Sequence, residues 1–163
     1  MILIYFFSDY LKITDGKRKY CLLNSHLEST KEGADFRREQ FKYLLDYFKT
    51  LPRDVTIIAG GDFNLRDTEV KAVGGLPKDV FDAWIESGQR KECEFTWDTL
   101  RNDTLSISSK FKPRCRFDRV YIRRAFPTAI KLVHFGLVGI ERLKPNVCFP
   151  SDHWGVITSY RFE

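Results

Sequence analysis

One long amphipathic helix stands between two apolar segments typical of strands, and this order restricts the chain to folds in which helices cover a sheet. The apolar side chains of the helix recur at helical spacing: Phe36, Phe41, Leu44, Leu45, Phe48 and Leu51. Ser29-Thr30-Lys31-Glu32 predicts a capping box at its start, and Leu51-Pro52 predicts its end. We therefore expect a layered α/β fold whose loops at strand ends carry the chemistry.

Short runs of β-branched or aromatic residues, bounded by Gly, Pro or Asp, predict the strands. They are Ile2–Phe7, Tyr20–Leu27, Val55–Gly60, Arg116–Ile122, Ile130–Leu137 and Trp154–Tyr160. Thr14-Asp15-Gly16-Lys17 predicts a hairpin turn between the first two. A second, short helix is expected after Asp67, ending at Gly74-Gly75.

Composition fits one globular domain and limits its partners. The chain has 163 residues, of which 43% are hydrophobic and 30% charged, as in an ordinary single domain. The net charge of +5 favours a polyanionic partner, although a solvated basic surface would give the same charge. The apolar opening Met1–Phe7 is too short to span a bilayer and lacks a basic leading segment, so no membrane association is expected.

The four cysteines indicate free thiols. Cys21, Cys93, Cys115 and Cys148 are far apart and have no CxxC spacing, which makes a zinc site unexpected. A domain of this size that forms a core of its own is typical of a reducing compartment.

An acid and an amide follow the predicted strand Val55–Gly60. The strand runs through glycines into Asp62 and Asn64, a common way to present a carboxylate at the edge of a sheet. Asp62 could deprotonate a water as general base, Asn64 could donate its amide to a phosphoryl oxygen, and Arg66 could bind a phosphate. The alternative is an Asx-turn that caps the following helix.

An adjacent aspartate and histidine precede the last predicted strand. Asp152 could fix the tautomer of His153 or help to hold a metal ion. His153 could then hydrogen-bond or protonate a phosphate oxygen in the transition state. The alternative is a structural Asp–His pair. The loop that carries Asp62 and Asn64, called the acid–amide loop below, favours a functional role.

Two further polar residues lie where the predicted strand Tyr20–Leu27 gives way to the helix. His26 could contact the phosphate. Ser29 could do the same, although capping of the helix is favoured for its hydroxyl alone. His134 lies within the alternation of a strand and is given no role.

A basic stretch surrounds Phe117. Its cations are Lys110, Lys112, Arg114, Arg116, Arg119, Arg123 and Arg124. Only Asp118 opposes them, and a simple ion pair with Arg116 or Arg119 would explain it. An aromatic face beside cations suits single-stranded or frayed DNA ends, whereas ordinary core packing would also explain Trp97 and Phe117.

These motifs, in this order, resemble the endonuclease/exonuclease/phosphatase superfamily of magnesium phosphodiesterases. The most specific are Ser25-His26-Leu27-Glu28-Ser29-Thr30, Gly61-Asp62-Phe63-Asn64-Leu65-Arg66-Asp67, Phe95-Thr96-Trp97-Asp98-Thr99 and Arg116-Phe117-Asp118-Arg119. They are most similar to the branch that releases topoisomerase II tyrosine from DNA 5′ ends, and the similarity runs from about Tyr20 to the end of the chain. The resemblance implies a DNase I-like layered α/β sandwich.

The resemblance implies catalytic roles for five matching positions. Asp62 would be the base that directs water at the 5′ phosphorus. Asn64, His26 and His153 would stabilise the charged phosphoryl group. Asp152 would face His153 and the metal, with Mg²⁺ as the cofactor and Mn²⁺ as its substitute.

The resemblance also implies contacts with DNA. Ser29 and Lys31 would lie along the DNA backbone, where the family usually has Arg in place of Lys31, so a bidentate clamp becomes a point charge. Arg66 would contact phosphate or the tyrosyl side. An apolar wall against the terminal nucleotide would consist of Trp97, Leu105 and Phe117.

The superfamily domain is longer than this chain and is a sandwich of two related halves. Its first half should carry a Trp-Asn motif and a Gln-Glu motif, whose Glu is the main metal ligand; neither motif occurs here. We expect residues 1–163 to be the second half of one such domain. One sheet would then lack its packing partner, and an uncovered apolar face predicts self-association.

Three functions are compatible with these residues. The first is hydrolysis of the 5′-phosphotyrosyl bond of topoisomerase II adducts, in the nucleus and also in the cytoplasm. The second is another superfamily activity, such as an abasic-site nuclease or RNA deadenylase, although the motifs around His26 and Trp97 weigh against it. The third is a non-catalytic fragment that binds DNA ends or a protein, which the missing Glu favours.

Overall fold

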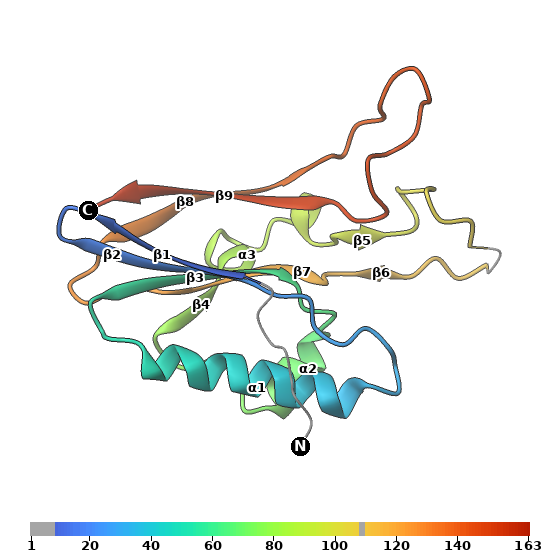
Figure 1. Cartoon of the computed structure of the whole chain (residues 1–163). Coiled ribbons are helices and arrows are strands. Elements are labelled where there is room, and N and C mark those ends of the chain that lie inside the picture. The colour runs from blue at the N-terminus through green and yellow to red at the C-terminus, as the bar shows by residue number, and fades with distance from the viewer. Residues whose placement is uncertain (1–8, 108–109) are drawn as a thin grey trace.

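The computed structural model describes residues 9–107 and 110–163 and is built around a five-stranded sheet (Figure 1). The strand order is β1-β2-β3-β7-β4. These strands are β1 Asp9–Asp15, β2 Arg18–Asn24, β3 Val55–Asp62, β4 Val80–Asp82 and β7 Asp118–Arg123. β2 and β3 are parallel and are connected through the helix α1 (Ala34–Thr50), whereas the other neighbours are antiparallel.

Helices cover one face of this sheet, and a two-stranded hairpin covers the other (Figure 1). α1 and α2 (Asp67–Ala72) lie on the first side, where Phe41 and Phe48 pack with Ile57 and Tyr121 of the sheet. The hairpin consists of β8 (Ile130–Val138) and β9 (Gly155–Phe162). Phe135 of β8 packs against Ile122 of β7. The expected layered α/β fold is confirmed.

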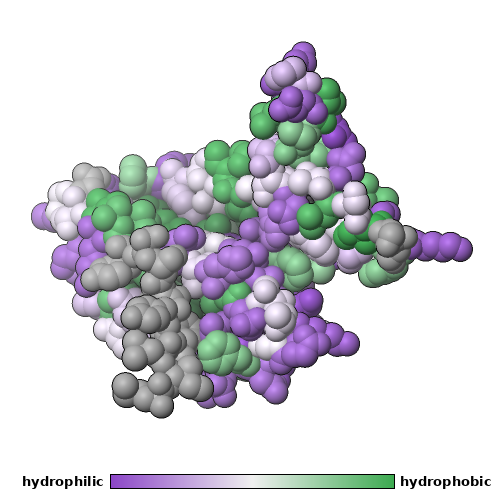
Figure 2. Space-filling model, turned by 45° about the vertical axis from the view of Figure 1, so that its right-hand side comes forward, coloured by the Kyte–Doolittle hydropathy of each residue, from purple (hydrophilic) through white to green (hydrophobic). Residues whose placement is uncertain are grey.

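The smaller elements lie on the hairpin side of the sheet and at its end. They are α3 Ala83–Glu86, the 3₁₀ turn η1 Lys91–Cys93, β5 Trp97–Asp98 and β6 Arg114–Cys115. α3 and η1 pack with Ile122 and Phe135. β5 and β6 pair with each other. Long connections leave this end, and Figure 2 shows the one between β8 and β9 rising from the body with hydrophobic and hydrophilic residues on its surface.

Most predicted elements occur with shifted ends, and one lies outside the described residues. The predicted strand Ile2–Phe7 is in that undescribed part, and β1 instead forms the hairpin with β2. Gly16, at φ 58°, supplies the left-handed turn between them. The predicted strand Arg116–Ile122 begins two residues later, at Asp118.

The predicted capping box of α1 is wrong. The helix begins at Ala34, and its N-cap is Gly33. The Glu28 carboxylate instead accepts both the N–H and the hydroxyl of Thr30, at 3.0 Å each. These bonds keep the segment before Gly33 as a loop. The predicted end is confirmed, because Leu51 leaves the helix in an extended conformation before Pro52.

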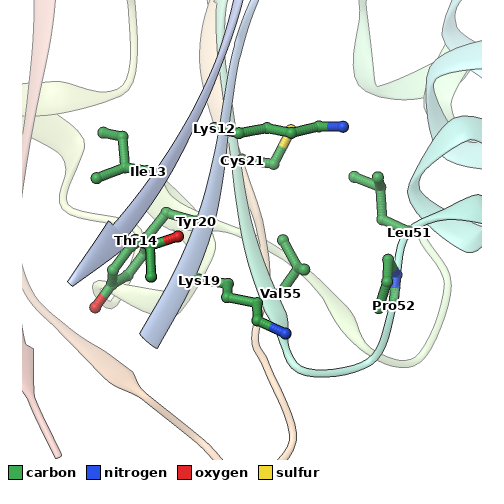
Figure 3. A pocket seen from close by; sticks show the side chains of 9 residues that line it. All are labelled: Lys12, Ile13, Thr14, Lys19, Tyr20, Cys21, Leu51, Pro52 and Val55. Atoms are coloured by element: carbon green, nitrogen blue, oxygen red, sulfur yellow. The ribbon is translucent and has the colours of Figure 1, made fainter. Parts of the chain in front are cut away.

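Two apolar hollows lie toward the Lys19 end of the sheet. A pocket of about 210 Å³ is enclosed by β1, β2 and the connection from α1 to β3; Figure 3 shows Leu51 and Pro52 facing Cys21 and Val55. A more open groove of about 370 Å³ lies between the sheet and the β8–β9 hairpin. Its lining is Ile13, Tyr20, Leu22, Ile58, Ile130, Tyr160 and Phe162.

The described residues contain neither a disulfide nor a helix able to span a membrane. All four cysteines are free thiols, as expected. In residues 9–107 and 110–163, each helix falls short of the length and hydropathy needed to cross a bilayer.

Candidate functional site

Two backbone segments approach each other closely beside Asp62, and this approach requires glycine at position 61. Gly61 has φ 141°, and a Cβ there would overlap the carbonyl oxygen of Ser25. Beyond this contact, Leu27 N–H donates to the carbonyl oxygen of Asp62 at 2.9 Å. The chain after β2 therefore follows the end of β3, which brings His26 Nε2 to 3.6 Å from Asp62 Oδ2.

Asn64 takes part in the Asx-turn considered above, although that turn does not cap α2, whose N-cap is Arg66. Its backbone N–H donates to Asp62 Oδ1 at 2.9 Å, which is the Asx-turn. Its side chain is 6% exposed, and Nδ2 donates to the carbonyl oxygen of Leu27 at 3.1 Å. An amide nitrogen carries two N–H groups, so a second donor is present for a ligand. The turn leaves Asp62 Oδ2 on the side of the histidines.

The environment of Asp62 suits a general base. Burial raises the pKa of its carboxyl and the charge of Asp118 adds to the rise, although the Asn64 N–H, His153 and His26 act in the opposite direction. A carboxylate with a raised pKa accepts a proton from water more readily.

The partner of His153 is Asp118. Sheet register places Asp118, the first residue of β7, opposite Asp62. Asp118 Oδ2 lies 2.7 Å from His153 Nδ1, while His153 Nε2 lies 3.9 Å from Asp62 Oδ2. The hydrogen bond with Asp118 raises the pKa of His153 in spite of burial. A protonated imidazole at this position could donate to a phosphoryl oxygen.

Two expectations about these aspartates are therefore wrong. Asp118 does not pair with Arg116 or Arg119 among the described contacts, because Asp67 and Asp82 take those guanidinium groups. Asp152 does not fix the histidine tautomer, since Asp118 holds Nδ1. Asp152 Oδ2 lies 3.9 Å from His153 Nε2 and accepts the indole N–H of Trp97 at 3.3 Å.

Three arginines of the basic stretch, Arg116, Arg119 and Arg123, are buried, whereas Lys110, Lys112 and Arg114 are exposed. Asp118 is not the only charge that opposes the stretch. Arg116 donates to Asp82 at 2.6 Å, and Arg114 donates to Asp98 at 2.9 and 2.8 Å. Arg123 donates to backbone carbonyls between Phe48 and Val55. The carboxylates that neutralise this stretch come from parts of the chain far from it in sequence.

Aromatic rings extend from His153 on one side. The Phe117 ring lies 6.3 Å from the His153 ring and 5.8 Å from the Trp97 ring. The Arg66 guanidinium lies 5.1 Å from the centre of the Phe117 ring. Leu105 is 44% exposed on the connection between β5 and β6. Two of the three residues predicted to form a wall are thus adjacent, together with Arg66.

Ser29 and Lys31, the two residues predicted to contact the DNA backbone, are exposed on the loop between β2 and α1. Sequence reasoning missed the residue that shapes this loop, Arg37, which is 1% exposed. Its guanidinium donates to the carbonyl oxygens of Glu28 and Thr30, at 2.8 Å each, and to Glu69 Oε1 at 2.7 Å. The signal was present, because Arg37 stands four residues before Phe41 on the buried face of α1.

Glu69 connects this loop to the acid–amide loop. Its other oxygen, Oε2, accepts the backbone N–H of Arg66 at 2.8 Å. The buried Arg37–Glu69 pair therefore connects the loop that carries Ser29 and Lys31 to the start of α2.

Asp62, Asp118 and His153 form one group that could hold a metal ion. One ligand atom from each lies within 4.8 Å of the others, and within residues 9–107 and 110–163 no other such group of three occurs. Mg²⁺ prefers six oxygen ligands and keeps several waters, whereas imidazole suits transition metals. The group therefore fits Mg²⁺ only in part, with two carboxylates.

Comparisons with known proteins find relatives in both sequence and structure. The chain is 43% identical over 147 residues to mouse (Mus musculus) tyrosyl-DNA phosphodiesterase 2, a match that covers 90% of this chain and 39% of the relative. The crystal structure of Danio rerio TDP2 complexed with single strand DNA product has a TM-score of 0.87 and 37% identity, covering 93% of this chain and 60% of that chain. Over this stretch the chain is similar to part of tyrosyl-DNA phosphodiesterase 2.

The match to tyrosyl-DNA phosphodiesterase 2 concerns part of that protein, because the chain spans 39% of the length of the mouse relative. The catalytic domain of human Nocturnin, at 20% identity, has a TM-score of 0.63 over 94% of this chain and 51% of that one. That likeness shows the fold alone, which is DNase I-like. No family model matches the chain.

Proposed function

We propose that this chain is the second half of an endonuclease/exonuclease/phosphatase domain that hydrolyses the 5′-phosphotyrosyl bond between topoisomerase II tyrosine and DNA. The observation that carries the proposal is the convergence of Asp62 with His26 and His153 at 3.6 and 3.9 Å, in a chain similar to tyrosyl-DNA phosphodiesterase 2. Its substrate would be a DNA 5′ end that carries a phosphotyrosyl peptide. Nuclear residence follows from that substrate, and a cytoplasmic fraction is proposed beside it.

Asp62 is the proposed general base. Its Oδ2 takes a proton from water as the water oxygen bonds to phosphorus, and the bond from phosphorus to the tyrosyl oxygen breaks. The tyrosine leaves as a phenolate and takes a proton from solvent, and Asp62 releases its proton to solvent. Asn64, His26 and protonated His153 donate hydrogen bonds to the phosphoryl oxygens, where negative charge develops.

Magnesium is the proposed cofactor, with Mn²⁺ as its substitute. The ion would neutralise charge on the phosphoryl group. Asp62, Asp118 and the nearby Asp152 are the carboxylates of this chain closest to the reacting centre. Mg²⁺ keeps several waters, which would supply remaining ligands.

Substrate contacts complete the proposal. Ser29 and Lys31 lie along the DNA backbone, and Arg66 reaches a phosphate from its position over Phe117. Trp97 offers its ring to the terminal base and packs against Phe117, which is buried at 8% exposed and supports it from behind; Leu105 adds an exposed apolar side chain.

A second candidate is binding of DNA ends without hydrolysis. The incomplete set of oxygen ligands favours it, because loss of metal ligands lowers the rate of phosphoryl transfer.

Hydrolysis and binding without hydrolysis are distinguished by whether a 5′-phosphotyrosyl oligonucleotide is turned over. Release of tyrosine from a 5′-phosphotyrosyl oligonucleotide is measured with Mg²⁺ for the wild type, Asp62→Asn and Asp46→Asn. Asp46 is a matched control on the exposed side of α1, paired with Lys49. We expect a loss of at least about a hundredfold for Asp62→Asn only. Equal turnover in all three would contradict the proposal, and binding without wild-type turnover would favour the second candidate.

A further inference from the structure

Thr96 joins the two chain segments that carry Asp118 and His153. It is fully buried (0% exposed) and directly precedes β5. Its backbone N–H donates to the carbonyl oxygen of Cys115 at 3.1 Å, and its own carbonyl oxygen accepts the N–H of Trp154 at 2.7 Å. The backbone of one residue thus links the end of β6 to the residue just before β9.

The hydroxyl of Thr96 adds a more specific contact. Its Oγ1 accepts the backbone N–H of Phe117 at 3.1 Å and that of Asp118 at 2.9 Å. Consecutive N–H groups that converge on one acceptor define the direction in which the chain continues. Here the chain continues into β7 with Asp118 opposite Asp62.

The segment at Phe117 and Asp118 is also hydrogen-bonded to the acid–amide loop. The carbonyl oxygen of Phe117 accepts the N–H of Phe63, next to Asp62, at 2.9 Å. On the other side, Trp97 forms an isolated antiparallel bridge with His153. Thr96 therefore stands between the chain segments that present Asp62, Asp118 and His153.

We propose that Thr96 is a positioning residue for the hydrolysis: its hydroxyl holds the backbone of Asp118 where the carboxylate can orient His153. The inference rests on the proposed function and deepens it. Thr96 acts through Asp118, whose 2.7 Å contact with His153 Nδ1 tolerates little displacement. Misplacement of a reacting group by about 1 Å can lower a rate by about a hundredfold.

Three substitutions separate positioning from general stability. Thr96→Val keeps the shape and removes the acceptor, and Thr96→Ser keeps the hydroxyl. The matched control is Thr56→Val, because Thr56 in β3 is also 0% exposed and its Oγ1 accepts the Ala125 N–H at 3.4 Å, away from Asp62. All are tested with the 5′-phosphotyrosyl oligonucleotide.

We expect Thr96→Val to lower kcat by about tenfold to a hundredfold with little change in KM. Thr96→Ser should restore kcat, and Thr56→Val should leave it unchanged even if stability falls. A normal kcat in Thr96→Val, or an equal loss of kcat in Thr56→Val, would overturn the inference.

Hydrogen exchange tests the same contact without turnover. The Phe117 and Asp118 amides should be protected in the wild type and in Thr96→Ser, and rapid wild-type exchange would overturn the inference even if Thr96→Val does not fold. If the wild type shows no turnover, the proposed hydrolysis fails. Thr96 is then judged by these amides: protection supports its hold on Asp118, and rapid exchange refutes it.

Discussion

Asp118 Oδ2 lies 2.7 Å from His153 Nδ1, across 35 positions of sequence. The pair brings the first residue of β7 to the residue two places before β9. It explains how a half-buried histidine keeps a raised pKa, and it makes the stability of the chain depend on pH.

Replacing Asp118 by Asn should weaken this pH dependence. A histidine with a raised folded pKa stabilises the fold fully below its unfolded value of 6.5, and the contribution is lost as pH rises through the folded pKa. Urea unfolding in EDTA should therefore show wild-type stability falling above that value, and falling less in Asp118→Asn. His134→Gln is the control on the exposed part of β8. The same slope in Asp118→Asn and wild type would refute the pair.

Gly61→Ala should destabilise the chain more than Gly74→Ala. Both glycines have positive φ, at 141° and 96°. A Cβ at Gly61 would overlap the Ser25 carbonyl, whereas nothing lies within 4 Å of a Cβ at Gly74. We expect a loss of about 1–2 kcal/mol at Gly74 from backbone strain alone and clearly more at Gly61. Thermal unfolding measures the difference, and equal losses would mean that β3 and the chain after β2 are not in close contact.

Arg37→Met should cost about 3–5 kcal/mol, because it leaves the buried Glu69 carboxylate without its partner. The double variant with Glu69→Leu should recover part of this loss, since no buried charge then remains. Chemical denaturation provides the free energies of unfolding. Lys49→Met is the control for an exposed ion pair, with Asp46, and should change little. A double variant less stable than Arg37→Met would contradict the explanation.

The chain should self-associate through the groove between the sheet and the β8–β9 hairpin. Ile13 and Phe162 line it and are 40% and 58% exposed, and contiguous exposed apolar surface favours association. Sedimentation velocity should show a concentration-dependent increase in the wild type that Phe162→Lys reduces. Val147→Lys is the control, since Val147 is 61% exposed on a different surface. A wild type that stays monomeric at high concentration would rule this out.

Features set by neighbours in sequence could be predicted. The buried face of α1 follows from the spacing of Phe41, Leu44 and Phe48, because helical periodicity depends only on local geometry. The hairpin at Gly16 and the end of α2 before Gly74 follow from the turn preferences of glycine. Asp62 and Asn64 are two residues apart at the end of a strand, so the sequence also predicts that they lie in the same loop.

Contacts between distant segments were decided by the tertiary structure. Asp152 stands next to His153 in sequence, yet Asp118 holds the ring, because sheet register places Asp118 opposite Asp62. Three arginines of the basic stretch, Arg114, Arg116 and Arg119, are neutralised by Asp98, Asp82 and Asp67, whose positions depend on how the layers pack. Thr96 shows the same limit, since its hydroxyl gains its role only when β6, β7 and β9 meet. Residue type and spacing thus determined which groups could take part, and long-range packing determined which of them meet, because register and layer contacts join residues that no local pattern relates.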